Sequence, residues 1–226
     1  MNETRVHLGC GPGPLAEGWT HLDGSWHAWL SKHRLMRSVA LKLTGHKPDL
    51  RGVEWSDDVV IHNLLRPLPF ETGSVSAIYS SHVLEHLYFA DAQRLLRECH
   101  RVLLSGGLIR IVVPDLASIV ARYHTSDDDS RADELLRSLH LRQPRRNESN
   151  VFLRVYDALC DFHSHKWMYD EQSLGHEMRQ AGFADITPKG VHDSDIEGIQ
   201  AIERKSRISN GEGICVEARK RSVGND

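Results

Sequence analysis

The stretch Val6-His7-Leu8-Gly9-Cys10-Gly11-Pro12-Gly13, followed by Leu22-Asp23, decides the fold of this chain. A short apolar strand runs into a glycine-rich turn, and a second strand ends in a carboxylate. Glycine has no Cβ, so it can adopt positive φ and let the backbone approach a ligand, while an acid at the tip of the next strand can bind both hydroxyls of a ribose. The pattern therefore indicates a site for a nucleotide-type cofactor.

Three further motifs follow in order. They are Asn63-Leu64-Leu65-Arg66-Pro67-Leu68-Pro69-Phe70, Ala77-Ile78-Tyr79-Ser80-Ser81-His82-Val83-Leu84-Glu85-His86-Leu87 and Arg101-Val102-Leu103-Leu104-Ser105-Gly106-Gly107. With the glycine turn, these stretches resemble the class I S-adenosylmethionine (SAM) dependent methyltransferases, especially the small-molecule, methyltransferase type 11-like group. The resemblance covers most of residues 5–115 and extends to members associated with polysaccharide synthesis. It implies a methyl-transferring enzyme with SAM as cofactor and S-adenosylhomocysteine as product.

The size and charge of the chain limit the classes of function. With 226 residues, 40% of them hydrophobic, the chain is long enough for one well-buried core, so we expect a single domain over residues 1–226. The net charge of −3 gives no general attraction for nucleic acid or anionic lipid. Four cysteines without metal-type spacing, and no window of about 20 apolar residues, favour a cytoplasmic protein without membrane insertion. We expect a monomer or a homodimer.

Strand-like and helix-like runs alternate along the chain. This alternation implies an α/β, Rossmann-like sheet of seven mostly parallel strands, with one antiparallel edge strand and helices on both faces. Apolar stripes predict helices at 92–103 and 170–181 that pack on this sheet. Such sheets bind ligands at the carboxyl ends of their strands. The predicted strands are residues 5–8, 20–23, 59–63, 76–80, 108–114, 185–191 and 213–220.

Two segments exceed the minimal fold. Residues 26–47 form a basic amphipathic stretch that can cover the site, join two subunits or lie on a membrane surface, and we favour the cover. Residues 116–166 contain helix-like runs at 132–141 and 150–162 and follow the fifth strand, where insertions usually shape the substrate pocket. We therefore expect both insertions to shape the acceptor pocket.

The resemblance assigns the cofactor site residue by residue. The glycine turn would wrap the methionine end of SAM, Asp23 would bind the ribose hydroxyls, and Asn63 and Leu64 would hold the adenine. Cys10 is interpreted as a small packing residue rather than a nucleophile. The complete set of predicted cofactor residues is Gly9, Cys10, Gly11, Gly13, Asp23, Asn63, Leu64, Ser81 and His82.

The spacing between the turn and the acid distinguishes SAM from a dinucleotide. Gly11 and Asp23 are twelve positions apart (23 − 11), whereas a dinucleotide fold places about 20 residues between its glycines and its acid. The first crossover helix must then be short or missing, and the pyrophosphate of NAD would lack the helix N-terminus that neutralises its charge. SAM carries no phosphate, so the spacing argues against NAD.

Methyl transfer to a hydroxyl needs a positioned acceptor and a base, and histidine suits the second task because its pKa lies near neutral pH. The chain has 15 histidines, of which those at predicted strand ends carry most weight. Similar sugar methyltransferases use an acid or a histidine after the fourth strand and an Asp after the fifth. We therefore predict His86 as the base, Asp115 as its orienter or as a second base, His82 as a substitute, and Glu85 beside them. The alternative is that these residues only cap the following helix.

A second constellation is Asp161-x-His163-x-His165, whose side chains would share one face of an extended chain and could bind a divalent metal. We favour a different interpretation without metal, since a helix can equally run through Asp161. The stretch from His165 to Asp170 resembles a segment that lines the acceptor pocket in relatives. His165 and Tyr169 are therefore predicted substrate contacts, with Trp167 either a further contact or a core residue.

The leading hypothesis is an O-methyltransferase for a small, polar, hydroxyl-bearing acceptor, and the resemblance favours a sugar or oligosaccharide. Two alternatives stay open: an N- or C-methyltransferase for another small molecule, and a SAM-binding interaction protein without turnover. Nucleic-acid methylation is disfavoured because the chain has no Asn/Asp-Pro-Pro-aromatic stretch for holding a flipped base.

Overall fold

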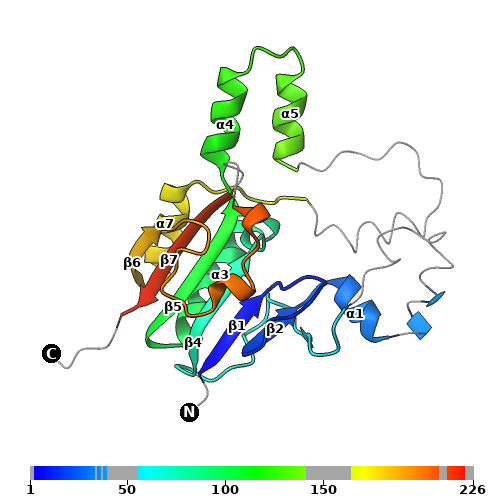
Figure 1. Ribbon diagram of the computed structural model, residues 1–226, viewed down its shortest axis with the longest axis vertical. Coiled ribbons are helices and arrows are strands. Elements are labelled where there is room, and N and C mark those ends of the chain that lie inside the picture. Colours follow the sequence, from blue (N-terminus) through cyan, green and yellow to red (C-terminus); the bar gives the residue numbers. More distant parts are fainter. Residues whose placement is uncertain are drawn as a thin grey trace.

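The computed structural model describes residues 3–33, 35, 36, 38, 39, 55–140, 164–208 and 213–221. In this part of the chain, seven strands form one sheet in the order β3-β2-β1-β4-β5-β7-β6 (Figure 1). Neighbouring strands pair in parallel except at β7, which runs antiparallel to both β5 and β6. The strands are β1 (Thr4–Leu8), β2 (Trp19–Asp23), β3 (Val60–Ile61), β4 (Val75–Ser81), β5 (Leu103–Pro114), β6 (Phe183–Pro188) and β7 (Gly213–Lys220).

This topology confirms the predicted α/β, Rossmann-like sheet. The chain starts in the middle of the sheet at β1, runs outward to β3, and then returns to β4 on the other side of β1. The carboxyl ends of β1, β2, β4 and β5 meet at one edge, and the reversal between β1 and β4 is where open α/β sheets bind ligands. The antiparallel strand β7 lies one place in from the edge, because β6 pairs with its outer side.

Strand β5 begins earlier than predicted. The sequence places its start at residue 108, whereas the strand begins at Leu103 and includes the glycine pair at 106–107. Leu103 pairs with Val75 and Leu108 pairs with Ala77, so β5 advances five residues while β4 advances two. The surplus forms a bulge, which keeps the glycines in the strand instead of in a turn before it.

The connection between β1 and β2, residues 9–18, contains no helix. It holds four glycines and two prolines, a composition that opposes helix formation. Gly9 and Gly11 both adopt φ of +65°, a conformation that side chains with a Cβ rarely accept. The short or missing first crossover helix predicted from the spacing is therefore confirmed.

Helices α3 and α7 pack on one face of the sheet (Figure 1). The predicted stripe of α3 is buried at Leu95, Leu96, Cys99 and Val102. Asp170 caps α7 through a reciprocal hydrogen-bonded capping box with the residue at its third position, as the acidic start of this segment predicts. The helices and 3-10 turns assigned among the described residues are α1 (Trp26–Lys32), η2 (Leu84–His86), α3 (Phe89–Val102), α4 (Leu116–Thr125), α5 (Arg131–Ser138), α7 (Glu171–Gln180), η3 (Ile199–Ala201) and η4 (Lys205–Arg207).

The opposite face of the sheet has a different cover. No helix between β1 and β2 is present to shield it, and the connection between β6 and β7 crosses this face instead, with the short turns η3 and η4. Ile196 and Ile199 of this connection pack against Tyr79, Val112 and Cys215 of the sheet. The β6–β7 connection, residues 189–208, thus supplies the apolar layer that a crossover helix normally provides.

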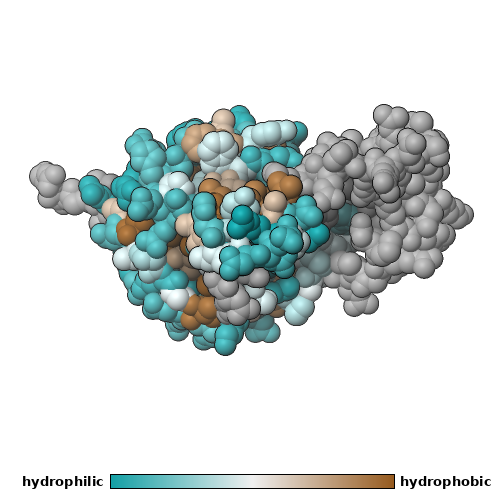
Figure 2. All heavy atoms as spheres, turned by 90° about the horizontal axis from the view of Figure 1, so that it is seen from above, coloured by the Kyte–Doolittle hydropathy of each residue, from teal (hydrophilic) through white to brown (hydrophobic). Residues whose placement is uncertain are grey.

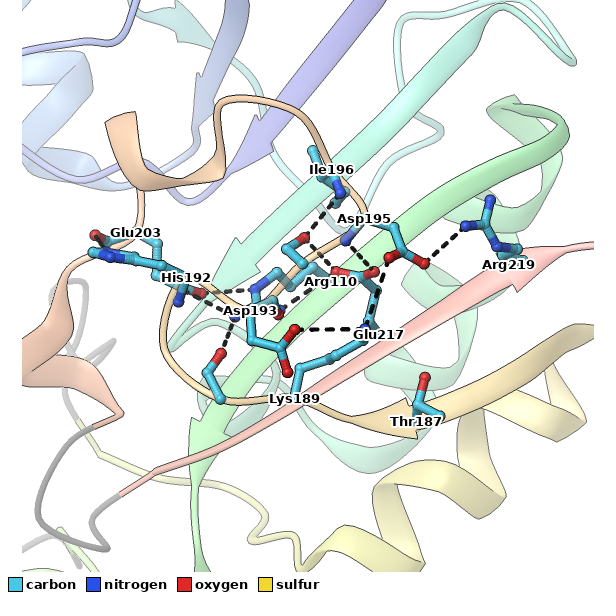
Figure 3. A network of polar contacts seen from close by, with 12 residues as sticks. Arg110, Thr187, Lys189, His192, Asp193, Asp195, Ile196, Glu203, Glu217 and Arg219 are labelled. Carbon is cyan, nitrogen blue, oxygen red and sulfur yellow. Dashed lines mark hydrogen bonds and ion pairs between the residues drawn. The ribbon is translucent and has the colours of Figure 1, made fainter.

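A buried ion pair fastens this connection to the sheet (Figure 3). The guanidinium of Arg110 on β5 donates hydrogen bonds to both carboxylate oxygens of Glu203, at 2.7 and 2.9 Å, and all of its side chain is buried. It also donates to the carbonyl oxygens of Gly190 and Asp193, each at 2.7 Å. Glu217 of β7 lies 3.4 Å from the same guanidinium. The bidentate geometry therefore fixes the path of residues 190–203 over the sheet.

The two predicted insertions are described in part. Helices α4 and α5 form a hairpin that projects beyond the carboxyl edge of the sheet (Figure 1), and α5 corresponds to the helix expected at 132–141. The helix expected at 150–162 lies outside the described residues. Helix α1 begins the 26–47 segment, and its residues Ala28 and Leu30 are buried.

No helix in the described part of the chain has both the length and the hydropathy that crossing a bilayer requires. Figure 2 shows the face seen from above Figure 1, where hydrophilic side chains predominate and the hydrophobic ones form separate small groups.

Candidate functional site

Asp23 at the end of β2 is tied directly to the glycine turn. Its carboxylate oxygens accept hydrogen bonds from the backbone N–H groups of Gly11, at 2.9 Å, and Ser25, at 2.8 Å. The N–H groups of Gly9 and Cys10 donate to the Leu22 carbonyl oxygen next to it. The turn that follows β1 is therefore folded back against the tip of β2, and the predicted cofactor residues of both strands lie side by side.

Cys10 in this turn has a protonated thiol. Burial, and after it the charge of the Asp23 carboxylate, raises the pKa of Cys10 to about 12. A thiol with this pKa is neutral at pH 7 and has little nucleophilic character. This agrees with a packing role for Cys10.

Asn63 and Leu64 lie at the same edge, because the His62 N–H donates to the carbonyl oxygen of Asp23 at 3.1 Å. The Asn63 side chain accepts a hydrogen bond from the Leu65 N–H at 2.9 Å and so closes a local turn. An amide oxygen has two lone pairs, which leaves acceptor capacity beside that turn. The exposed Asn63 and half-buried Leu64 thus extend the surface that begins at Asp23.

The segment after β4 reaches the glycine turn from the other side. A Cβ on Gly9 would lie 2.3 Å from a methyl group of Val83, so only glycine permits this close approach. His82 has φ of +55°, an uncommon conformation for a residue with a side chain, and its N–H donates to the Val112 carbonyl oxygen at 2.9 Å. Backbone strain of this kind concentrates at functional sites. Ser81, the preceding residue, ends the strand in a buried position.

Glu85 is the centre of a histidine cluster. Its side chain is fully buried, with the Nδ1 of His82 3.0 Å and the Nε2 of His86 4.0 Å from its Oε1. The ring of His165 lies 5.0 Å from that of His86 and 4.8 Å from that of His140. We refer to Glu85, His82, His86, His140 and His165 as the Glu85 cluster.

Backbone hydrogen bonds join the two chain segments that form the cluster. The N–H groups of Lys166 and Trp167 donate to the carbonyl oxygen of Glu85, at 2.7 and 3.2 Å. Burial, ahead of the nearby charges, lowers the pKa of His165 to about 4. His165 is therefore neutral at pH 7 and keeps one nitrogen lone pair.

Asp115 caps a helix, and its predicted role beside His86 stays a prediction. It is the N-cap of α4, where its carboxylate accepts hydrogen bonds from the Ala117 N–H at 3.0 Å and the Ser118 hydroxyl at 2.5 Å. The acid that lies against His86 is Glu85. The hypothetical metal ligands Asp161 and His163 lie outside the described residues.

The two aromatic residues after His165 take opposite positions. Tyr169, predicted to contact substrate, is 1% exposed and belongs to the core, and its carbonyl oxygen accepts from the N–H of Leu116. Trp167 is not a core residue: it is 46% exposed and its ring lies 4.8 Å from that of Phe89. Of these two aromatic rings, only Trp167 presents substantial surface to an acceptor.

Two arginines that the sequence analysis did not select lie beside predicted site residues, Arg204 at the glycine turn and Arg207 at His82. Arg204 has its Nη2 3.4 Å from the Pro12 carbonyl oxygen and 3.1 Å from the position that a Cβ on Gly13 would occupy. The carbonyl oxygen of Arg207 lies 3.3 Å from the Nε2 of His82. Both come from the β6–β7 connection, 192 and 125 positions after the residues that they contact, so no local motif links them to the site.

Comparison with known proteins agrees with this geometry. Residues 6–111 match the model of the family described as "Methyltransferase domain". No curated protein matches the chain. The strand order, the glycine turn tied to Asp23 and the family match together define a SAM-dependent methyltransferase.

The solved structures that match this chain are distant in sequence. A chain of the Haloferax volcanii complex between the Trm112 methyltransferase activator and its methyltransferase is 15% identical, with 100% of this chain and 85% of that chain covered and a TM-score of 0.50. Human N-acetylserotonin methyltransferase in complex with SAM is 14% identical, with 97% and 48% covered and a TM-score of 0.48. An O-methyltransferase family protein from Burkholderia thailandensis is 14% identical, with 98% and 52% covered and a TM-score of 0.49. The chain spans about half the length of these last two.

Proposed function

We propose that this methyltransferase transfers the methyl group of SAM to a hydroxyl group of a small polar acceptor, with a saccharide as the acceptor class. The observation that carries the proposal is the Glu85 cluster. Its members His82, Glu85 and His86 follow β4 at the carboxyl edge of the sheet, and Val83 within the same segment contacts Gly9 of the glycine turn. Groups that can take a proton therefore adjoin the place where the family fold holds SAM.

The cofactor would lie across the turn from Gly9 to Gly13, with its ribose at Asp23 and its adenine at Asn63 and Leu64. The Asp23 carboxylate already accepts two backbone N–H groups. Each of its oxygens keeps further lone pairs, which the ribose hydroxyls can use. The same two hydrogen bonds preorganise the acid for the ligand.

Arg204 supplies a charge that fits the other end of SAM. Its guanidinium lies beside Pro12 and Gly13, where the methionine portion would pass. A guanidinium binds a carboxylate through two parallel hydrogen bonds. We assign Arg204 to the carboxylate of the methionine portion.

His86 is the best placed base. Its Nδ1 lies 3.4 Å from the carbonyl oxygen of Ser164. A carbonyl oxygen only accepts, so this contact requires the proton on Nδ1 and leaves the lone pair on Nε2. Nε2 can then take the hydroxyl proton during methyl transfer, and the Glu85 carboxylate 4.0 Å away stabilises the imidazolium that forms.

Exposed aromatic side chains beside the cluster support a saccharide acceptor. Trp167 is 46% exposed and Tyr88 is 68% exposed, and Trp167 is held by its backbone to Glu85. An indole ring offers a flat apolar surface to the C–H face of a sugar, while histidines can hydrogen-bond its hydroxyls. A polar acceptor with apolar faces therefore suits this surface.

The test combines calorimetric titration of SAM, S-adenosylhomocysteine and NAD with a methyl-transfer assay on a panel of mono- and disaccharides, amines and phenols. We expect SAM and S-adenosylhomocysteine to bind, NAD not to bind, and the methyl group to appear on a sugar oxygen. Transfer only to nitrogen or carbon would refute the hydroxyl assignment. SAM binding without transfer to any acceptor would favour the interaction protein instead.

A further inference from the structure

The Glu85 cluster brings carboxylate oxygens and histidine nitrogens, all of which can carry lone pairs, close together around a buried side chain. The Glu85 side chain is 0% exposed, and neither of its carboxylate oxygens receives a hydrogen bond from the described residues. The nearest nitrogen is the Nδ1 of His82, 3.0 Å from Oε1, and a buried carboxylate in this position is costly unless a cation or a proton lies beside it. The atoms around Glu85 indicate which cation can bind there.

Contacts around the cluster place the ring proton of both His86 and His165 on Nδ1. The Nδ1 of His86 faces the Ser164 carbonyl oxygen, and the Nδ1 of His165 lies 3.2 Å from the Met168 sulfur. Both partners are acceptors, so each Nδ1 carries the proton and each Nε2 carries the lone pair. Second contacts of this kind orient histidines in metal sites.

His82 shows the same convergence. Its Nε2 lies 3.3 Å from the carbonyl oxygen of Arg207, which requires a proton on that nitrogen. Its Nδ1 then faces Oε1 of Glu85 at 3.0 Å, and two electron-rich atoms at this distance need a proton or a metal ion beside them. A proton on His82 would neutralise Glu85 alone, whereas a metal ion could also use the lone pairs of His86 and His165.

We propose that Glu85, His86 and His165 bind one divalent transition-metal ion, with Zn²⁺ as the fitting example. Each residue offers one ligand atom, and the three atoms lie within 4.8 Å of one another. Two imidazoles and one carboxylate form a donor set that zinc and other first-row metals take in enzymes, with further positions left for water or substrate.

The distances require only a small closure. Ligand atoms about 2.0 Å from a tetrahedral metal lie about 3.3 Å apart, so ligand atoms within 4.8 Å of one another need to approach by at most about 1.5 Å. The hydrogen bonds from Lys166 and Trp167 to the Glu85 carbonyl oxygen already hold the two ligand-bearing segments together. Rotation of the side chains can therefore complete the site without moving the backbone.

The sequence around Glu85 reads His-x-x-Glu-His from His82 to His86. On an α-helix this spacing places both histidines on one face and serves zinc enzymes. Here the segment forms the 3-10 turn η2, and His82 precedes it at positive φ. His86 therefore turns toward His165 of a distant segment, which takes the place of the helical partner.

A metal at this position would take part in the proposed methyl transfer, and only this catalytic role rests on the proposed function. The ion would occupy the Nε2 of His86 and would lower the pKa of a coordinated acceptor hydroxyl, so the metal-bound site would take the place of the His86 imidazole as the base. The binding inference itself depends on the Glu85 cluster alone.

The test is Co²⁺ and Zn²⁺ binding to the chelator-treated full chain, free of any affinity tag. Co²⁺ would be followed by its d–d absorption and Zn²⁺ by competition with a chromophoric chelator. We expect one ion per chain, without the charge-transfer band of a thiolate ligand. Glu85→Gln and His165→Gln should each weaken binding by about a hundredfold or more, since loss of an outer-shell partner alone costs about 10–100-fold.

His176→Gln is the matched control, because His176 is an exposed histidine of α7 away from the cluster. Circular dichroism and melting temperature would show that each variant folds. No saturable binding, a thiolate band, or equal affinity in His165→Gln and His176→Gln would overturn the inference. Methyl transfer by metal-free protein that binds no ion would overturn the metal inference and leave the proposed function standing. Ion binding without transfer to any acceptor would support the metal site and contradict the proposed function.

Discussion

His7 on β1 should make the stability of this protein depend on pH in a specific way. It is 9% exposed, and its Nδ1 lies 3.2 Å from the Nδ1 of His21, whose Nε2 lies 2.9 Å from the Ala16 carbonyl oxygen. The carbonyl requires a proton on Nε2 of His21, so His21 accepts from the Nδ1–H of His7. The His7 ring is neutral in this arrangement, and an added proton on it would have to be buried.

Burial is the main reason that the pKa of His7 falls to about 3, with the charges of His21, Arg204 and Arg207 adding to it. The unfolded chain returns this group to its ordinary pKa of about 6.5. Between these two values the unfolded state binds the proton and the folded state does not. Stability is therefore complete above about pH 6.5 and declines as the pH falls toward about 3.

The size of the effect follows from the two pKa values. At about pH 5, protonation of the unfolded state favours unfolding by on the order of 2 kcal/mol for this one residue. His7→Asn keeps an N–H donor near the position of Nδ1 but cannot take up a proton. We therefore expect the variant to lose about 2 kcal/mol less stability than the native chain between about pH 7.5 and about pH 5.

Urea denaturation followed by tryptophan fluorescence measures this difference. Both proteins would be compared at both pH values, so that any cost of the Asn side chain that is independent of pH cancels from the result. Carboxylates that titrate in the same range contribute equally to both proteins. Equal losses of stability in the two proteins would refute the reasoning that His7 is buried in its neutral form.

Four changes test the remaining assignments. Asp23→Ala should weaken S-adenosylhomocysteine binding by about a hundredfold in calorimetry, because two hydrogen bonds to a charged group are lost, and unchanged affinity would remove the ribose assignment. His86→Gln should lower kcat by about 10²–10⁴-fold with normal SAM binding, whereas turnover at the native rate would exclude it as the base. Arg204→Leu should weaken binding of S-adenosylhomocysteine but not of 5′-methylthioadenosine, which has no carboxylate, and an equal loss for both ligands would point to a structural role. Glu203→Gln should lower the free energy of unfolding by about 3–5 kcal/mol because Arg110 is left buried with incomplete pairing, and a denaturation curve like that of the native chain would contradict this.

The glycine turn and its consequences could be predicted because they depend on local sequence. Gly9, Gly11 and the nearby prolines exclude a helix wherever they stand, and the short distance to Asp23 leaves no room for one. The apolar face of α3 could also be predicted, since Leu95, Leu96 and Cys99 repeat at helical spacing. In each case the backbone preference and the burial pattern give the same answer.

Contacts within the site could not be predicted in the same way. Asp115 and Glu85 both follow strands that end at the same edge, and the sequence contains nothing to say which carboxylate turns toward His86. Asp115 is followed by a helix whose first N–H groups need an acceptor, so its side chain caps α4. Glu85 lies within the turn η2, where its side chain is directed into the protein. The choice depends on the element that follows each acid.

The absence of a helix between β1 and β2 and the position of Arg204 are connected through the β6–β7 connection. Without a helix between β1 and β2, one face of the sheet would remain uncovered, and the β6–β7 connection covers it, anchored by Arg110 and Glu203. That path brings the residue after Glu203 to the glycine turn, so Arg204 lies where the proposed carboxylate of SAM would need a positive charge. The segment that covers this face of the sheet would then also supply the proposed cofactor contact. A change that loosens the Arg110–Glu203 pair should accordingly weaken SAM binding as well as stability, although neither residue contacts the glycine turn.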